Sequence, residues 1–449
     1  MSYRVLNSQL ICAKYEQPYP MIVRGEGAVL VDDQGRRYLD VSGATAAVTH
    51  IGHGNERVAQ ALAAQARILA VHTTHLFHSP VVEAYFERLC DFAPDGFDRA
   101  WTVSGGTEAV ENALKLAFQY HRAKGRSTRR RFIGRWSSYH GNSLATLDVG
   151  GLVGRRSFYS DLYAGLNLHV GPCLPYRRPA GMTVEAYEDH LVEEFRTVVH
   201  AHPDEIAAFV AEPVVGSALG AGVPTDGYFA RIATICRAHD ILMIADEVMT
   251  GFGRTGRRFG CQHFGTHADV LACAKGISGG YIPLGALLVR DTVSEVLRES
   301  GDPFFSGQTY SCIPLAAAVG MAVLDVIEED GLVQRAATIG AYLKGRLEER
   351  LLDLPCVGEV RGLGMFLGVE FVQDADTKAP WPDEIRFSKR VEAAALKHGL
   401  ATLGARGCVD QVHGDHMLIA PPLILTEAQA DTIADGLRAA CEDVMAALG

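Results

Sequence analysis

The chain has 449 residues, of which 48% are hydrophobic and 21% are charged, and its formal net charge is -11. This composition is typical of a globular protein with a large core, and the length predicts two or three domains. The negative charge argues against nucleic acid as the main partner, and no apolar run approaches the roughly 18 residues that a membrane span needs.

The first predicted elements lie near the N-terminus. Residues 1–17 lack a basic segment that leads into an apolar one, so no signal peptide is expected. Residues 29–31 and 38–41 predict the strands of a hairpin, and the turn between them contains Gly35.

From about residue 60 the pattern alternates between helix and strand. Apolar residues at 110, 113, 114, 117 and 118 follow the spacing of one helix face. Short apolar runs predict strands at 100–103, 132–133, 208–211, 241–245, 270–274 and 286–289. Such alternation predicts an α/β fold with a mostly parallel sheet that is covered on both faces.

The pattern changes after about residue 325. Strands are expected at 365–371 and 417–419, and helices at 384–398 and 427–448, with Thr426 and Gln429 as a capping box for the last one. We expect a small α+β domain made from residues 1–60 and 326–449, and a large domain made from residues 61–325.

The most informative feature is the pair Asp246 and Lys275. Each follows a short apolar run and precedes glycine-rich sequence, as expected where a buried parallel strand ends. Adjacent parallel strands would bring both side chains to one edge of the sheet. A lysine there can hold an aldehyde cofactor as a Schiff base, and an aspartate can hold a protonated pyridine nitrogen.

Three further strand ends carry candidate ligands. Residues 104–109, Ser-Gly-Gly-Thr-Glu-Ala, form either a phosphate-binding helix start or an ordinary tight turn. Tyr139 is either a ring that stacks on a flat heterocycle or a structural tyrosine. Glu212 either contacts a ligand or forms a structural ion pair.

Other motifs are set aside. Asp246-Glu247 resembles the acid pair of an ATPase, but the chain has no Gly-Lys-Ser/Thr loop. Residues 251–256 match a dinucleotide fingerprint but open no apolar helix. The histidine clusters lack neighbouring ligands, so no metal site is expected. The basic run at 126–131 is interpreted as a solvated loop.

Together these motifs resemble the class III, fold type I pyridoxal-phosphate-dependent aminotransferases. The likeness extends from about residue 29 to residue 423. It centres on Asp-Glu-Val-Met-Thr-Gly-Phe-Gly-Arg-Thr-Gly at 246–256, with Lys275 following Asp246 by 29 residues (275 minus 246). The resemblance implies a large domain with a mostly parallel seven-stranded sheet and a smaller α+β domain built from both termini. It implies pyridoxal 5'-phosphate as cofactor.

The resemblance also implies roles for single residues. Lys275 would carry the Schiff base and act as catalytic base, and Asp246 would pair with the pyridine nitrogen. The remaining cofactor contacts would come from Gly105, Gly106, Thr107, Tyr139, Glu212, Val248 and Thr309. Thr309 would be donated by the neighbouring subunit, which makes a homodimer the minimum unit, with a tetramer also open.

Substrate choice is the least determined part. Met249 favours the ω-amine:pyruvate branch of the family. Ala47 stands where these members often carry a bulky aromatic residue, which implies a roomier pocket. The carboxylate-binding arginines of two branches fall at Gln411 and Leu418 in this chain. Arg406, in a loop expected at 404–407, is therefore the candidate for the acceptor carboxylate.

The expected activity is ping-pong transfer of an amino group from an ω-amine or amino acid to an oxo-acid, with pyruvate as the expected acceptor. A racemase, aminomutase or decarboxylase on the same fold stays open, as does a catalytically silent binding or assembly protein. The 10 cysteines show no tight pairing pattern, so a cytoplasmic location is expected.

Overall fold

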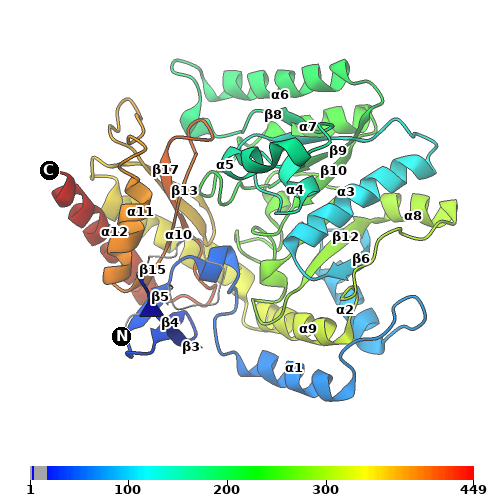
Figure 1. The fold of residues 1–449 in the computed structure, drawn as a ribbon, viewed down its shortest axis with the longest axis horizontal. Helices are drawn as coiled ribbons and strands as arrows, with labels where there is room; N and C mark the ends of the chain where they lie inside the picture. The colour runs from blue at the N-terminus through cyan, green and yellow to red at the C-terminus, as the bar shows by residue number, and fades with distance from the viewer. Residues whose placement is uncertain (1–2, 5–17) are drawn as a thin grey trace.

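The computed structural model describes residues 3–4 and 18–449. Its centre is a seven-stranded sheet of order β6-β12-β11-β10-β9-β7-β8 (Figure 1). The strands are β6 (Phe97–Val103), β7 (Arg131–Arg135), β8 (Leu168–Val170), β9 (Ile206–Ala211), β10 (Leu242–Asp246), β11 (Val270–Cys273) and β12 (Gly285–Arg290). Strand β12 runs antiparallel to both neighbours, and the other pairings are parallel. The expected mostly parallel, seven-stranded sheet is confirmed.

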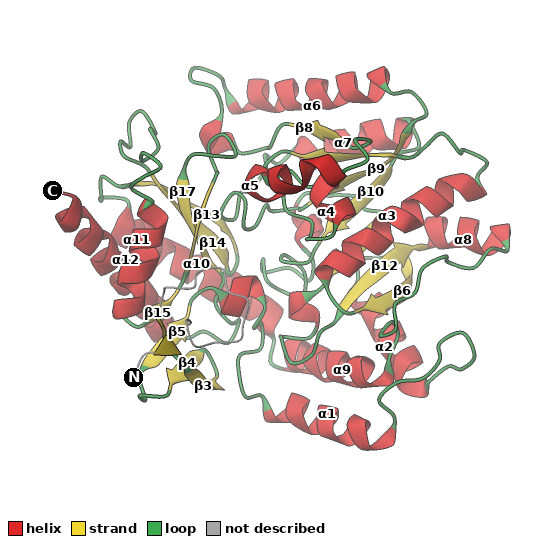
Figure 2. Ribbon diagram, viewed as in Figure 1, coloured by secondary structure: helices red, strands yellow, loops and turns green. Residues whose placement is uncertain are grey.

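Successive residues of the central strands point to opposite faces of the sheet, so their side chains pack into two different hydrophobic cores. Leu242 and Ile244 pack with residues of α3 (Gly106–Ala123). Met243 packs instead with residues of α6 (Val184–Ala201) and α7 (Tyr228–Ala238). Helices therefore cover both faces of the sheet (Figure 2), and the central strands β9, β10 and β11 are continuous apolar runs up to their ends.

Further helices surround the sheet and link it to the rest of the chain. They are α1 (Glu56–Ile68), α2 (Pro80–Phe92), α4 (Leu144–Val149), α5 (Val153–Arg156), α8 (Asp291–Ser300) and α9 (Pro314–Glu329). The domain boundaries expected at 60/61 and 325/326 stay predictions. Each of them falls within a helix, the first in α1 and the second in α9. No helix among the described residues is long and apolar enough to cross a membrane.

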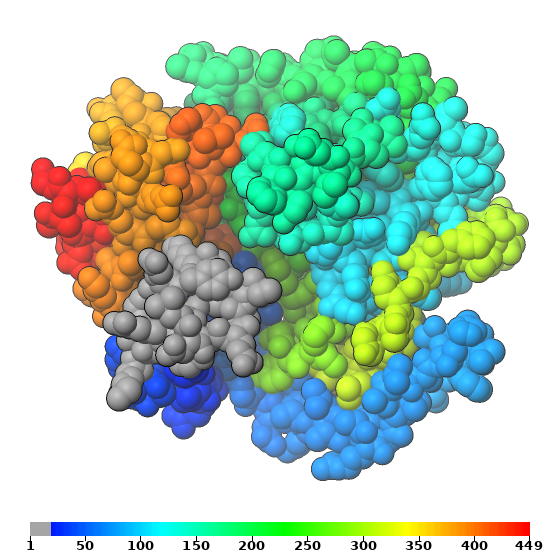
Figure 3. All heavy atoms as spheres, in the orientation of Figure 1, coloured from blue at the N-terminus to red at the C-terminus, as the bar shows by residue number. Residues whose placement is uncertain are grey.

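Two four-stranded sheets bring the chain ends together. One has the order β13-β14-β17-β16, with β13 (Val357–Leu363), β14 (Phe366–Phe371), β16 (Leu403–Arg406) and β17 (Asp415–Ile419). The other has the order β15-β5-β4-β3, with β3 (Ile22–Glu26), β4 (Val29–Asp32), β5 (Arg37–Asp40) and β15 (Leu400–Ala401). The predicted hairpin is thus present as β4 and β5, and β15 joins it to the C-terminal segment, on one side of the molecule (Figure 3).

The C-terminal helices are α10 (Leu332–Leu351), α11 (Phe387–Lys397) and α12 (Glu427–Leu448). The predicted capping box of α12 is present, since the Thr426 side chain accepts from Gln429 N and the Gln429 side chain accepts from Thr426 N. Helix α11 begins three residues later than expected, after Arg386 in a left-handed conformation (φ 49°).

Candidate active site

Strands β10 and β11 are parallel neighbours, and Asp246 lies opposite Ala272 in their register. Lys275 follows the end of β11 by two residues, so both functional candidates lie at the carboxyl ends of adjacent strands, as predicted. Both line one cavity of about 160 Å³. Its other lining residues are Gly106, Thr107, Tyr139, His140, Gly141, Glu212, Val248, Met249 and Ala274.

Lys275 opens a single 3₁₀ turn, Lys275–Ile277, with a left-handed backbone (φ 52°). Its Nζ atom makes no hydrogen bond or ion pair with any described residue. Burial lowers the pKa of this amine to about 8, and it outweighs the opposing effect of Asp246 and Glu212. A larger fraction of this amine than of an ordinary lysine is therefore neutral near neutral pH, and the neutral form acts as nucleophile and base.

Asp246 is buried and held by two hydrogen bonds. His140 Nδ1 lies 2.8 Å from its Oδ2 atom, and Val248 N donates to its Oδ1 atom over 3.1 Å. The carboxylate can only accept, so the His140 proton lies on Nδ1. His140 Nε2 is buried without a partner among the described residues. Sequence reasoning did not assign His140 a role, although it adjoins Tyr139 at a strand end.

Glu212 follows β9 and is also buried. Its carboxylate accepts hydrogen bonds from Tyr139 N (3.0 Å) and Gly216 N (2.8 Å). Burial raises the pKa of Glu212, the neighbouring Asp246 raises it further, and His140 opposes both. A structural ion pair was one of the two alternatives for Glu212, and it is absent among the described residues. Backbone donors hold the carboxylate instead, and one of them is the N–H of Tyr139.

The start of α3 forms the third wall. Its N-cap is Gly105, and no side chain caps the free N–H groups of the first turn. A Cβ atom at Gly105 would meet nothing within 4 Å, whereas one at Gly106 would lie 2.9 Å from Val248 Cγ1. The N-terminus of α3 therefore combines free N–H donors with open space beside Gly105. This combination favours the binding of an anion.

These groups fit pyridoxal 5'-phosphate. The uncapped N-terminus of α3 suits its phosphate, and the buried Asp246 suits its pyridine nitrogen. The unpaired Lys275 amine suits its aldehyde. Tyr139 and Val248 line the same cavity and provide flat and branched apolar surfaces for the ring.

The other predicted site residues lie outside this cavity. Ala47 is fully buried with a left-handed backbone (φ 53°). Thr309 is exposed in the loop between α8 and α9. Gln411 is partly buried in the turn after β16, where its N–H donates to Gly407 O over 3.0 Å. Because Thr309 is exposed, its segment is accessible to a neighbouring molecule.

Arg406 belongs to a strand, so the loop expected at 404–407 is wrong. Residues 403–406 form β16, whose register with β17 pairs Arg406 with Asp415. The Arg406 guanidinium donates to Asp383, and its Nε atom lies 3.8 Å from Asp415 Oδ1. Two carboxylates therefore already neutralise this cation.

Arg155 is a second cation near the site that sequence reasoning missed. Its guanidinium carbon lies 5.1 Å from the centroid of the Tyr139 ring. The side chain is exposed and forms no ion pair with the described residues. In the sequence it is one of two adjacent arginines on the short helix α5, a pattern that predicts no site.

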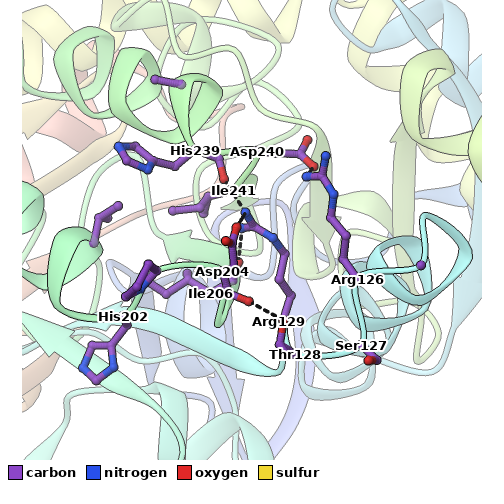
Figure 4. A pocket seen from close by; sticks show the side chains of 14 residues that line it. Arg126, Ser127, Thr128, Arg129, His202, Asp204, Ile206, His239, Asp240 and Ile241 are labelled. Atoms are coloured by element: carbon purple, nitrogen blue, oxygen red, sulfur yellow. Dashed lines mark hydrogen bonds and ion pairs between the residues drawn. The ribbon is translucent and has the colours of Figure 1, made fainter.

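A larger cavity, of about 650 Å³, lies at the opposite ends of the strands (Figure 4). Residues 126–129 of the basic run line it, and the expectation of a solvated loop is wrong for Arg129. This side chain is buried and donates to Ile206 O, Asp204 Oδ1 and His239 O. The described residues contain no cluster of three or more histidines, cysteines and acids that could hold a metal ion.

Comparison with known proteins agrees with this geometry. The family model "Aminotransferase class-III" matches residues 11–441. The putrescine–pyruvate aminotransferase of Pseudomonas aeruginosa is 33% identical over 95% of this chain and 91% of its own length. An (S)-enantioselective ω-transaminase from Thermomicrobium roseum is 36% identical, with a TM-score of 0.88 over 96% of this chain and 94% of its own.

The ω-transaminase of Pseudomonas jessenii, solved in complex with PMP, superposes with a TM-score of 0.91 at 32% identity over 98% of both chains. Family match, fold and cavity chemistry point to the same cofactor and reaction class. The chain therefore belongs to the class III aminotransferases and is a pyridoxal-phosphate-dependent aminotransferase.

Proposed function

We propose that this enzyme transfers an amino group from an ω-amine or amino acid to an oxo-acid, with pyruvate as the preferred acceptor. The observation that carries the proposal is the meeting of Lys275, Asp246 and the uncapped start of α3 in one cavity. Met249 in the cavity wall and the putrescine–pyruvate relative support the ω-amine:pyruvate assignment.

In this proposal Lys275 and Asp246 are the catalytic residues. The cofactor, when bound, supplies a ring that absorbs the electron pair released at the amine-bearing carbon. Lys275 Nζ would accept the proton from that carbon and deliver it to the cofactor's C4′ carbon, and a neutral amine is suited to accepting the proton. Asp246 holds a positive charge on the ring nitrogen, and His140 holds Asp246 in place.

The remaining walls would orient the ring and its phosphate. We assign Tyr139 and Val248 to the two ring faces, and Gly105, Gly106 and Thr107 to the phosphate. Thr107 Oγ1 already accepts from Asn142 N over 3.2 Å, which leaves its O–H proton free to donate to an anion. Glu212, fixed by two backbone donors, would contact the cofactor or the substrate amine.

An acceptor carboxylate needs a cation at the mouth of this cavity. Arg155 is our first candidate, because it lies over Tyr139 and its charge is not neutralised by a described carboxylate. Arg406 is the second candidate, since it would first have to leave Asp383. Ala47 and Gln411 lie outside the described cavity, so we assign them only to the outer part of the substrate pocket, where neither supplies charge.

We further propose a homodimer with shared active sites, in which Thr309 contacts the partner's phosphate group. Exposed apolar side chains surround this segment in sequence, with Phe305 70% and Tyr310 61% exposed. The chain after α1 lies beside it, since Leu315 N donates to Ala70 O over 3.3 Å, and it exposes Leu76 and Phe77. Such a patch is typical of a protein interface.

A cytoplasmic location is proposed as well. Nine described cysteines are free, and eight of them are buried, as expected for a protein that keeps its thiols reduced.

A half-reaction screen tests the proposed function. The holoenzyme is mixed with single amines or amino acids, and loss of the absorbance of the lysine-bound cofactor is followed. Addition of pyruvate should restore the band and yield alanine, and 2-oxoglutarate serves as the competing acceptor. A racemase, aminomutase or decarboxylase would yield no alanine, and that result would contradict transamination to pyruvate.

A further inference from the structure

Arg254 is a fully buried arginine whose charge is unpaired in the described structure. Its Nη1 atom donates to Met365 O (3.1 Å) and Pro421 O (2.5 Å), and its Nη2 atom donates to His50 Nδ1 (3.2 Å). All these acceptors are uncharged. Burial of a cation without a carboxylate partner is costly, so the position calls for a functional reason.

His50 lies between this cation and the segment that contains the lysine. Because arginine can only donate, His50 Nδ1 must accept, and its Nε2–H then donates to Gly251 O over 3.2 Å. His50 is therefore a neutral ring, and burial together with the Arg254 charge lowers its pKa well below the ordinary value. A Cβ atom at Gly276 would lie 2.5 Å from His50 Nε2, so the ring lies against the residue that follows Lys275.

The charges around Lys275 are consequently of both signs. Asp246 and Glu212 favour its ammonium form, while burial and Arg254 disfavour it. His140 lies behind Asp246, and His50 is neutral. Asp40, the carboxylate that acts on Arg254 from a distance, accepts hydrogen bonds from Ala44 N and Thr49 Oγ1 instead.

We propose that Arg254 is a positioning residue for Lys275: a fixed, buried cation, held behind the lysine through His50, that disfavours the ammonium form of Nζ. The inference rests on the proposed role of Lys275 in the reaction. Arg254 also receives the Met365 N–H on its backbone oxygen over 3.0 Å, so the segments that begin β14 and follow β17 hold the cation in place. Its placement thus depends on three distant parts of the chain.

The test compares Arg254→Gln with wild type by the pH dependence of Lys275 labelling. An amine-reactive reagent is applied to the full, cofactor-free chain, and the labelled peptide is measured by mass spectrometry. The variant should label with a midpoint about one pH unit higher, which makes labelling near neutral pH about tenfold slower. The visible band of the holoenzyme should shift its pH midpoint in the same direction.

Two variants separate charge from structure. Arg335→Gln is the matched control, because Arg335 also donates to a backbone carbonyl, Leu425 O, over 2.6 Å on helix α10. It should keep the wild-type midpoint. Arg254→Lys retains the charge and should lie within about half a pH unit of wild type.

A folded Arg254→Gln with the wild-type midpoint would overturn the inference. If that variant is too unstable to purify, Arg254→Met, which also removes the charge, decides: a raised midpoint supports the inference, and the wild-type midpoint contradicts it. Labelling in the cofactor-free chain does not require Lys275 to carry the cofactor, so failure of the proposed function would be seen separately.

Discussion

His140 and Asp246 are joined by a 2.8 Å hydrogen bond between two buried side chains that lie 106 residues apart in sequence. The bond fixes the carboxylate at the end of β10 and leaves His140 Nε2 enclosed without a described partner. Asp246 is therefore oriented before any cofactor arrives, which reduces the reorganisation that binding requires.

His140→Ala should weaken cofactor binding and lower kcat. Loss of a hydrogen bond to a charged group costs about 1.5–3 kcal/mol, which corresponds to roughly a 10–150-fold change in an equilibrium constant. Cofactor titration followed by absorbance measures the affinity. His190→Ala, at an exposed position on α6, is the control. Equal cofactor affinities for the His140 variant and wild type would rule out this supporting role.

Arg155→Ala should raise the KM for pyruvate about tenfold or more while leaving the KM for a simple amine nearly unchanged. The reason is that only the oxo-acid carries a carboxylate for the guanidinium to bind. Arg406→Ala is compared in parallel, because that arginine already pairs with Asp383. A selective effect of Arg406→Ala alone would move the assignment to the second candidate.

Acid should destabilise the fold through buried histidines. His121 and His416 are fully buried, and burial lowers the pKa of each to about 4, from the ordinary 6.5. The unfolded chain takes up these protons first, so their contribution to stability is complete above the ordinary value and is lost as pH falls from 6.5 towards about 4.

His416→Gln tests this pH dependence. Glutamine keeps a donor for Ser217 O but does not titrate in this range. The fall in Tm between about pH 7.5 and about pH 5 should shrink by about 2–4 °C relative to wild type. An unchanged fall would mean that His416 does not contribute to acid sensitivity.

Mixed dimers test the proposed role of Thr309. Lys275→Ala and Thr309→Ala should each have little activity alone. In a mixed dimer one site would receive Lys275 from one subunit and Thr309 from the other, so about a quarter of the wild-type activity should return after random reassortment into pairs. Mixtures that stay as inactive as the separate variants would contradict the shared site.

Most of the large sheet follows from the sequence because its strands are buried on both faces. The runs that predicted β9, β10 and β11 are continuous and apolar for this reason. Strand β8 has only three residues, and β13 contains Glu359, Arg361 and two glycines, so neither gave an apolar signal.

From the residues alone, a functional side chain was predictable only where it follows the end of a strand. Asp246, Lys275, Glu212 and Tyr139 all follow apolar runs, and the family likeness supplied Val248 and Thr309. The contacts of His140 and Arg254 were not predictable, because their partners are 106 and 204 residues away. Arg406 was misplaced because Gly404 and Gly407 suggested a loop, whereas β17 pairs with this segment.

Borohydride reduction of the holoenzyme, followed by peptide mass spectrometry, tests the central claim most directly. Reduction makes the bond between the cofactor and its lysine permanent, and we predict one modified peptide, with the adduct on Lys275. Lys275→Ala should lose both this adduct and multiple turnover, whereas Lys397→Ala, at an exposed position on α11, should retain both. An adduct on another lysine, or wild-type turnover by Lys275→Ala, would contradict the account.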